Sequence, residues 1–214
     1  MKFAVILSGC GVYDGAEIHE STMALLAIVR NGGTYEIFAP DVQQHHVVNH
    51  ITGEEMNETR NVMVESARIA RGAISSLDKY DASKFDALIL PGGFGVAKNL
   101  SSYAFDGTNC TVDKYVEKAI RQTHGSGKPI GALCIAPVLI TRLLGEVDVT
   151  VGHDPATASD IEEMGGIHIK APNGEIVIDT TNRIVTNPCY MIDASISDIA
   201  EGADNVVKAM LELE

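Results

Sequence analysis

Short, largely apolar runs alternate along the chain with segments in which apolar residues recur every three or four positions. The apolar runs, typical of strands buried on both faces, cover residues 3–8, 35–39, 85–90, 129–133 and 147–151. The segments with helical spacing cover residues 18–31, 112–124, 135–144 and 155–164. This alternation predicts a doubly wound α/β fold, in which helices cover both faces of a mostly parallel sheet.

The rest of the chain shows less regular patterns. Hairpin strands are expected at residues 167–170, 175–179 and 184–186. Residues 172–174, Pro-Asn-Gly, predict a turn between the first two of these strands. Residues 194–213 carry Leu, Val and Ile on one face and predict a long last helix, whereas residues 61–77 predict a surface helix.

Residues 43–50 hold three of the seven histidines of the chain. Histidine is a common metal ligand, so a metal site is one interpretation of this segment. However, no carboxylate or cysteine completes a usual ligand set at helical or turn spacing. We therefore expect an exposed edge strand or hairpin here, and no metal.

Composition and charge narrow the classes of function. The chain has 214 residues, 45% of them hydrophobic, which suffices for one packed domain over residues 1–214. Its formal net charge of −13 disfavours nucleic acids and anionic membranes as partners, because both require Lys and Arg. The first apolar run is too short for an export signal, and no run approaches the roughly 18 apolar residues of a membrane span. We therefore expect a cytoplasmic protein with reduced cysteines.

The end of the apolar run at residues 129–133 carries the strongest chemical signal. Cys134 follows this run directly, and a segment with helical spacing begins at Ile135. A sharp turn from strand to helix lifts one side chain clear of the sheet, and the N-terminus of a helix favours a thiolate. The pattern predicts a nucleophile; the alternative is a small apolar side chain in an ordinary core.

Other strand ends supply groups that complement a cysteine, because ligands of such sheets bind beyond the carboxyl ends of the strands. Glu20, or Glu17 in its place, could move protons there. Gly92 and Gly93 lie in a glycine loop at a strand end, and N–H groups of this loop, with that of Ile135, could hold an oxyanion.

Two later strand ends add further candidates. His153 could pair with Cys134 and carry protons near neutral pH, although a histidine there is more often a helix-entry residue. Asn187 and Pro188 end the last strand and are expected to line the same site. Each of these signals is weak alone, but together they lie at one edge of the predicted sheet.

Taken in chain order, these residues resemble the class I glutamine-amidotransferase-like superfamily. The set that carries the resemblance is Glu20, residues 91–95, Cys134, His153 and the turn at Asn187 and Pro188. It is most similar to the PfpI-type branch, which holds intracellular proteases and glutathione-independent glyoxalases. Within that branch, the segments at residues 8–15, 17–20 and 186–191 are most similar to one group of proteins. The name of that group refers to isoprenoid biosynthesis.

The resemblance implies a flavodoxin-like fold, a homodimer and conversion of glyoxal to glycolate without a cofactor. It implies that Cys134 is the nucleophile, with Glu20 and His153 beside it. Peptidases of this branch place a histidine directly after the nucleophile, where this chain has Ile135. Amidotransferases carry a His-x-Glu pair that is missing from this sequence, so neither peptidase nor glutaminase activity is expected.

Two classes of function remain open from the sequence. In the first, Cys134 adds to a small 2-oxoaldehyde, Glu20 or His153 moves a proton between the adjacent carbons, and water releases the hydroxy acid. Whether that activity serves free glyoxal or the repair of glycated groups stays open. In the second class nothing is turned over: Cys134 is a redox sensor, or the site serves a regulatory protein linked to isoprenoid metabolism.

Overall fold

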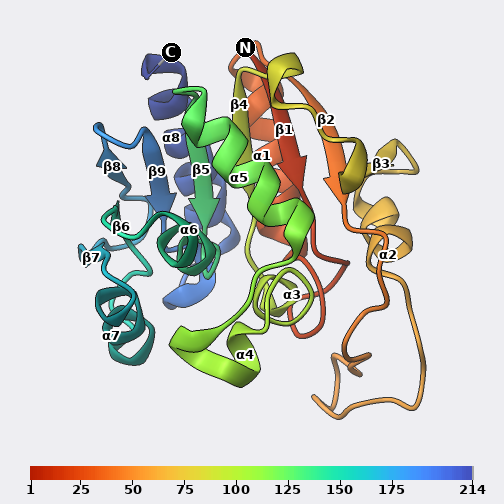
Figure 1. The fold of residues 1–214 in the computed structure, drawn as a ribbon. Coiled ribbons are helices and arrows are strands. Elements are labelled where there is room, and N and C mark those ends of the chain that lie inside the picture. Colours follow the sequence, from red (N-terminus) through yellow and green to blue (C-terminus); the bar gives the residue numbers. More distant parts are fainter. Residues whose placement is uncertain (214) are drawn as a thin grey trace.

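The computed structural model describes residues 1–213 and has a mostly parallel sheet at its centre (Figure 1). Seven strands of the described chain pair in the order β3-β2-β1-β4-β5-β9-β8. Their bounds are Lys2–Ile6 for β1, Thr34–Ala39 for β2, Ile74–Ser76 for β3, Ala87–Leu90 for β4, Ile130–Leu133 for β5, Val177–Asp179 for β8 and Ile184–Asn187 for β9. Neighbouring strands are parallel, except that β8 runs antiparallel to β9.

Helices cover both faces of this sheet (Figure 1). On one face α1 (Ile18–Arg30) packs against α8 (Ile196–Glu212), and on the other α5 (Lys114–Gly125) packs against α6 (Pro137–Leu144). Strands rich in Val, Ile and Leu suit burial between two helical layers. The flavodoxin-like, doubly wound α/β fold predicted from the sequence is therefore confirmed.

Each face of the sheet has its own hydrophobic core. The core beneath α1 and α8 includes the fully buried side chains of Phe3, Ile28 and Val206. The core beneath α5 and α6 includes those of Ile120 and Leu139. The strands are thus fixed on both faces, which gives the loops at their carboxyl ends a rigid support.

Smaller elements lie around the carboxyl edge of the sheet and beside it. They are α2 (Val62–Ile69), α3 (Phe94–Lys98), α4 (Tyr103–Asp106), β6 (Asp148–Val149), α7 (Pro155–Glu163) and β7 (Ile167–His168). In Figure 1, α3 and α4 lie just beyond the strand arrowheads. Within the described residues, no helix is long and apolar enough to cross a membrane.

The structure corrects the predictions for residues 61–77 and 167–170. The surface helix is shorter than expected and is followed by edge strand β3, because Arg71 and Gly72, with φ of 53° and 83°, end the helix. The strand at residues 167–170 forms no hairpin with the strand that follows it. It is β7, and it pairs in parallel with β6 because helix α7 connects the two.

The histidine-rich segment, residues 43–50, forms an irregular loop rather than a continuous strand. Isolated antiparallel bridges join Gln43 to Asn61 and Val48 to Glu55. The segment therefore keeps part of the expected hairpin pairing, but it does not extend the sheet.

Candidate active site

Cys134 lies at the sharp turn between β5 and α6, at the carboxyl edge of the sheet. Its φ of 60° is in the left-handed region, which non-glycine residues adopt at strained positions. Its backbone N–H donates to the carbonyl of Asn187 at 2.9 Å, which fixes the turn against the end of β9. The structure thus has the elbow geometry expected for this segment.

The carboxylate of Glu20, on α1, faces the cysteine. Glu20 is fully buried; its Oε2 accepts the Gly92 N–H at 2.9 Å and its Oε1 accepts the Tyr190 N–H at 3.3 Å. The Cys134 sulfur lies beside this carboxylate, against the same side of Gly92. Glu17 instead caps α1, where its Oε2 accepts the Glu20 N–H at 2.7 Å. Of the two candidates, Glu20 is therefore the carboxylate in contact with the cysteine.

Burial and neighbouring charge change the pKa of both groups. Loss of water, followed by the charge of Glu17, raises the pKa of Glu20 to about 7. Burial also raises the pKa of the Cys134 thiol well above its ordinary value, and the charge of Glu20 adds to this rise. Backbone N–H groups of Gly93 and Ile135 reach the sulfur and lower its pKa, but burial outweighs them.

The prediction of a thiolate, made from the N-terminus of the helix, is therefore wrong for the site without substrate. A buried sulfur beside a carboxylate keeps its proton, because two negative charges in a site removed from water destabilise each other. The arrangement is a thiol beside a base with a pKa close to neutral pH. Such a pair is activated by transfer of the thiol proton to the carboxylate.

The glycine loop after β4 fits closely against the cysteine. A Cβ atom on Gly92 would lie 2.4 Å from Cys134 Cβ and 2.9 Å from its sulfur, so only glycine permits this approach. Gly93 is the N-cap of α3 and has a φ of 95°. Its N–H and that of Ile135 converge on the sulfur, where an oxyanion on a carbon bound to that sulfur would form.

The predicted proton carrier His153 lies in different surroundings. It is exposed and lines a cavity of about 320 Å³ with Pro172 and Ile192, among others. The structure places its side chain at this cavity and not against the Cys134 sulfur. Pairing of His153 with Cys134 stays a prediction without support from the geometry.

Asn187 and Pro188 are buried at the end of β9, as expected, but the Asn187 amide is occupied by the protein itself. Its Oδ1 accepts the Cys189 N–H at 2.9 Å, and its Nδ2 donates to the Glu175 carbonyl at 2.6 Å. The side chain packs directly against Gly202 of α8. This arrangement suits a residue that shapes the turn, whereas substrate binding was the role predicted for it.

Cys189, in the turn that the sequence places at the end of the last strand, forms a second buried turn beside Cys134. One feature of the site was missed from the sequence, a hydrogen bond of 2.8 Å between His19 Nδ1 and the Tyr190 hydroxyl. The partners are 171 residues apart, so no local pattern indicates it.

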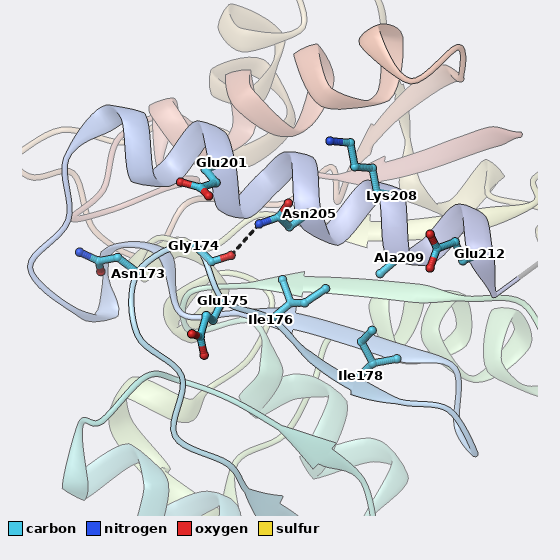
Figure 2. Close-up of a pocket in the computed structure, with 10 residues that line it drawn as sticks. All are labelled: Asn173, Gly174, Glu175, Ile176, Ile178, Glu201, Asn205, Lys208, Ala209 and Glu212. Atoms are coloured by element: carbon cyan, nitrogen blue, oxygen red, sulfur yellow. Dashed lines mark hydrogen bonds between the residues drawn. The ribbon is translucent and has the colours of Figure 1, made fainter.

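A larger cavity of about 670 Å³, shown in Figure 2, has neither Cys134 nor Glu20 in its lining. It opens between the segment at residues 173–178 and helix α8, and Asn205 Nδ2 donates to the Gly174 carbonyl across it at 2.9 Å. Its lining includes Glu175, Glu201 and Glu212. Among residues 1–213, no group of three His, Cys, Asp or Glu side chains is arranged to hold a metal ion.

Comparison with known proteins identifies relatives of this chain by their sequence. No family model matches the chain. The ES1 protein homolog, mitochondrial, of Rattus norvegicus and the glutamine amidotransferase-like class 1 domain-containing protein 3, mitochondrial, of Homo sapiens are each 46% identical over 99% of this chain. The match covers 84% of the rat protein and 83% of the human protein.

Solved structures agree with these sequence matches. An isoprenoid biosynthesis protein with an amidotransferase-like domain from Ehrlichia chaffeensis is 37% identical, covers 99% of both chains and has a TM-score of 0.92. A glyoxalase III from Candida albicans shares the fold alone, with 13% identity, coverage of 100% of this chain and 97% of that one, and a TM-score of 0.62.

Fold, elbow and matches together define a glutamine-amidotransferase-like class 1 protein of the DJ-1/PfpI fold. Within that class, the chain belongs to the family of the ES1 proteins. The relatives also correct one prediction: they are named as mitochondrial proteins, a finding that overturns the cytoplasmic location expected from the sequence.

Proposed function

We propose that the chain is a cofactor-independent glyoxalase, which converts glyoxal and other small 2-oxoaldehydes to hydroxy acids at Cys134. The observation that carries this proposal is that the Cys134 thiol and the buried carboxylate of Glu20 lie side by side and shift each other's pKa. A base with a pKa of about 7 suits proton transfer at neutral pH. The fold shared with a glyoxalase III is consistent with this chemistry.

The first step forms a hemithioacetal. As the Cys134 sulfur adds to one carbonyl carbon of glyoxal, Glu20 accepts the thiol proton. The carbonyl double bond becomes an alkoxide, which the N–H groups of Gly93 and Ile135 stabilise. Glu20 then returns the proton to this oxygen and is again an ionised base.

The second step moves hydrogen between the two carbons. Glu20 removes the proton from the carbon that carries sulfur, an enediol forms, and the proton is delivered to the neighbouring carbon. The product is a thioester of Cys134, and water hydrolyses it to glycolate and the free thiol. One carbon is oxidised while its neighbour is reduced, so the reaction needs no external oxidant or reductant. We assign both proton transfers to Glu20 rather than to the exposed His153.

A regulatory role linked to isoprenoid metabolism is the second candidate function. It is favoured by the name of the Ehrlichia chaffeensis relative. The strings at residues 8–15, 17–20 and 186–191 also resemble the enhancing-lycopene-biosynthesis proteins. In this role Cys134 would turn nothing over, and the protein would act through a partner.

Trapping of the covalent intermediate tests the glyoxalase. The protein is incubated with glyoxal, glycolate is quantified, and intact mass reports any adduct. We expect glycolate and a one-glyoxal adduct at Cys134 from the wild type, neither from Cys134→Ser, and only slow formation of both from Glu20→Gln, because that variant lacks the base that both steps use. Cys110→Ser, which alters a buried thiol elsewhere, serves as the matched control. Glycolate formation by Cys134→Ser at the wild-type rate would overturn the assignment of Cys134, and absence of glycolate from the wild type would overturn the proposal in favour of the regulatory role.

A further inference from the structure

A second strained cysteine lies beside the proposed nucleophile. Cys189 begins the short helical turn Cys189–Met191 after β9, the strand that pairs in parallel with β5. Its φ of 43° is left-handed, like the 60° of Cys134. Both residues are buried, with 3% and 7% of their surface exposed, and both belong to the core beneath α1 and α8. The two cysteines therefore lie on the same side of the sheet.

Direct contacts join the two turns. The Cys134 N–H, which donates to the Asn187 carbonyl, also reaches the Cys189 sulfur. Burial raises the pKa of that thiol well above its ordinary value, and the N–H offsets only part of this rise. Glu20 connects the turns from α1, because it lies beside the Cys134 thiol and accepts the N–H of Tyr190, the residue after Cys189. Paired strands lie about 4.8 Å apart, and a disulfide spans Cα separations of roughly 4.4–6.8 Å. Cys134 and Cys189 follow directly after the pair Leu133 and Asn187, and the Cys134 N–H reaches the Cys189 sulfur, so we infer that the two cysteines come within the range of a disulfide.

The surroundings of the two sulfurs give them different roles. The Cys134 sulfur faces a base, Glu20, and two backbone N–H groups. The Cys189 thiol instead donates to Asn187 Oδ1 at 3.1 Å, and burial keeps its proton in place. Cys134 is therefore the sulfur that reacts first with an electrophile. Cys189 is the second sulfur beside it, which can then react with the modified Cys134.

We propose that Cys134 and Cys189 form a redox-active dithiol pair that is oxidised by a hydroperoxide. In the first step the Cys134 sulfur attacks the distal peroxide oxygen, the O–O bond breaks, and a sulfenic acid and an alcohol or water result. In the second step the Cys189 sulfur attacks the sulfenic sulfur, the S–O bond breaks, and the Cys189 proton leaves with the oxygen as water. Two electrons pass from the two thiols to the peroxide, and a disulfide remains.

Oxidation with limiting hydrogen peroxide, followed by intact mass and peptide mapping, tests this pair. From the reduced wild type we expect loss of two hydrogens, a linked peptide pair containing Cys134 and Cys189, and full reversal by dithiothreitol. In Cys189→Ser the same treatment leaves Cys134 as sulfenic and then sulfinic acid, with the mass of one and then two added oxygens. Cys10→Ser and Cys110→Ser, which alter the other two free cysteines, keep the disulfide.

The wild-type peptide map decides the proposal even where a variant folds poorly. Accumulation of sulfinic acid at Cys134 in the wild type, without the linked peptide, would overturn it. The linkage of Cys134 to Cys10 in place of Cys189 would overturn it equally. Glycolate production is measured on fully reduced protein without peroxide, so failure of the dithiol pair and failure of the glyoxalase are distinguishable.

Discussion

The turns at Cys134 and Cys189 have similar backbones and different partners. Each follows a buried strand of the same parallel pair, and each holds a cysteine with a positive φ. The sulfur of Cys134 meets the carboxylate of Glu20, whereas the sulfur of Cys189 meets the amide oxygen of Asn187. A carboxylate accepts a proton near neutral pH and an amide does not. The comparison teaches that the strained turn places a sulfur, and that the group facing it decides what the sulfur does.

The largest expected effect comes from exchanging sulfur for oxygen in each turn. Cys134→Ser removes the proposed nucleophile, and we expect glyoxal turnover to fall by a factor on the order of 10³ or more. Cys189→Ser changes a thiol that donates to Asn187 Oδ1, and we expect a loss of less than about tenfold. Steady-state kinetics on the two reduced variants makes the comparison. Equal losses would show that the two turns do not differ as described.

The next effect concerns folding stability, because Glu20 is buried with a raised pKa. Its folded pKa of about 7 lies well above its ordinary value of 4.5. A raised carboxyl pKa contributes stability below pH 4.5, and this contribution is lost as the pH rises through 7. The loss amounts to about 3 kcal/mol at most, since one unit corresponds to about 1.4 kcal/mol.

Urea unfolding at pH 5 and pH 8 measures this contribution. We expect the wild type to lose free energy of unfolding between the two values, and Glu20→Gln to lose less, because it has no carboxyl group to ionise. The free energy of unfolding of Glu20→Gln therefore rises relative to that of the wild type as the pH rises. A difference that is constant from pH 5 to pH 8 would show that Glu20 ionises in the folded state as it does in water.

A smaller effect is expected from the glycine loop that packs against Cys134. In Gly92→Ala the new Cβ would lie 2.4 Å from Cys134 Cβ, so the loop or the elbow must shift. We expect a loss of about 1–3 kcal/mol of unfolding free energy, as for other overpacked sites. Gly125→Ala is the matched control, because a Cβ there meets no atom of the described structure within 4 Å. Equal stability of the two variants would contradict the close packing of loop and cysteine.

Much of the fold was predictable from local pattern. The elbow at Cys134 follows from a short apolar strand that leads directly into a helix, and both are encoded by adjacent residues. The shorter helix α2 was not predicted, because Arg71 adopts a positive φ that its side chain does not indicate.

Less of the site was predictable, because it depends on distances between segments. The choice of Glu20 over Glu17 depends on where α1 begins, since Glu17 is the capping residue and Glu20 lies one turn further, beneath the loop at Gly92. The pKa of Cys134 was predicted in the wrong direction, because backbone N–H groups are visible in a local pattern and burial is not. The exposure of His153 was missed for the same reason.

The pH dependence of glyoxal turnover in the wild type and in Glu20→Gln tests most directly whether Glu20 is the base of Cys134. We expect wild-type turnover to fall as the pH drops through about 7, because protonated Glu20 no longer accepts the thiol proton. In Glu20→Gln we expect slow turnover without this acidic limb. An acidic limb and a maximal rate unchanged in Glu20→Gln would contradict the assignment of Glu20 as the base.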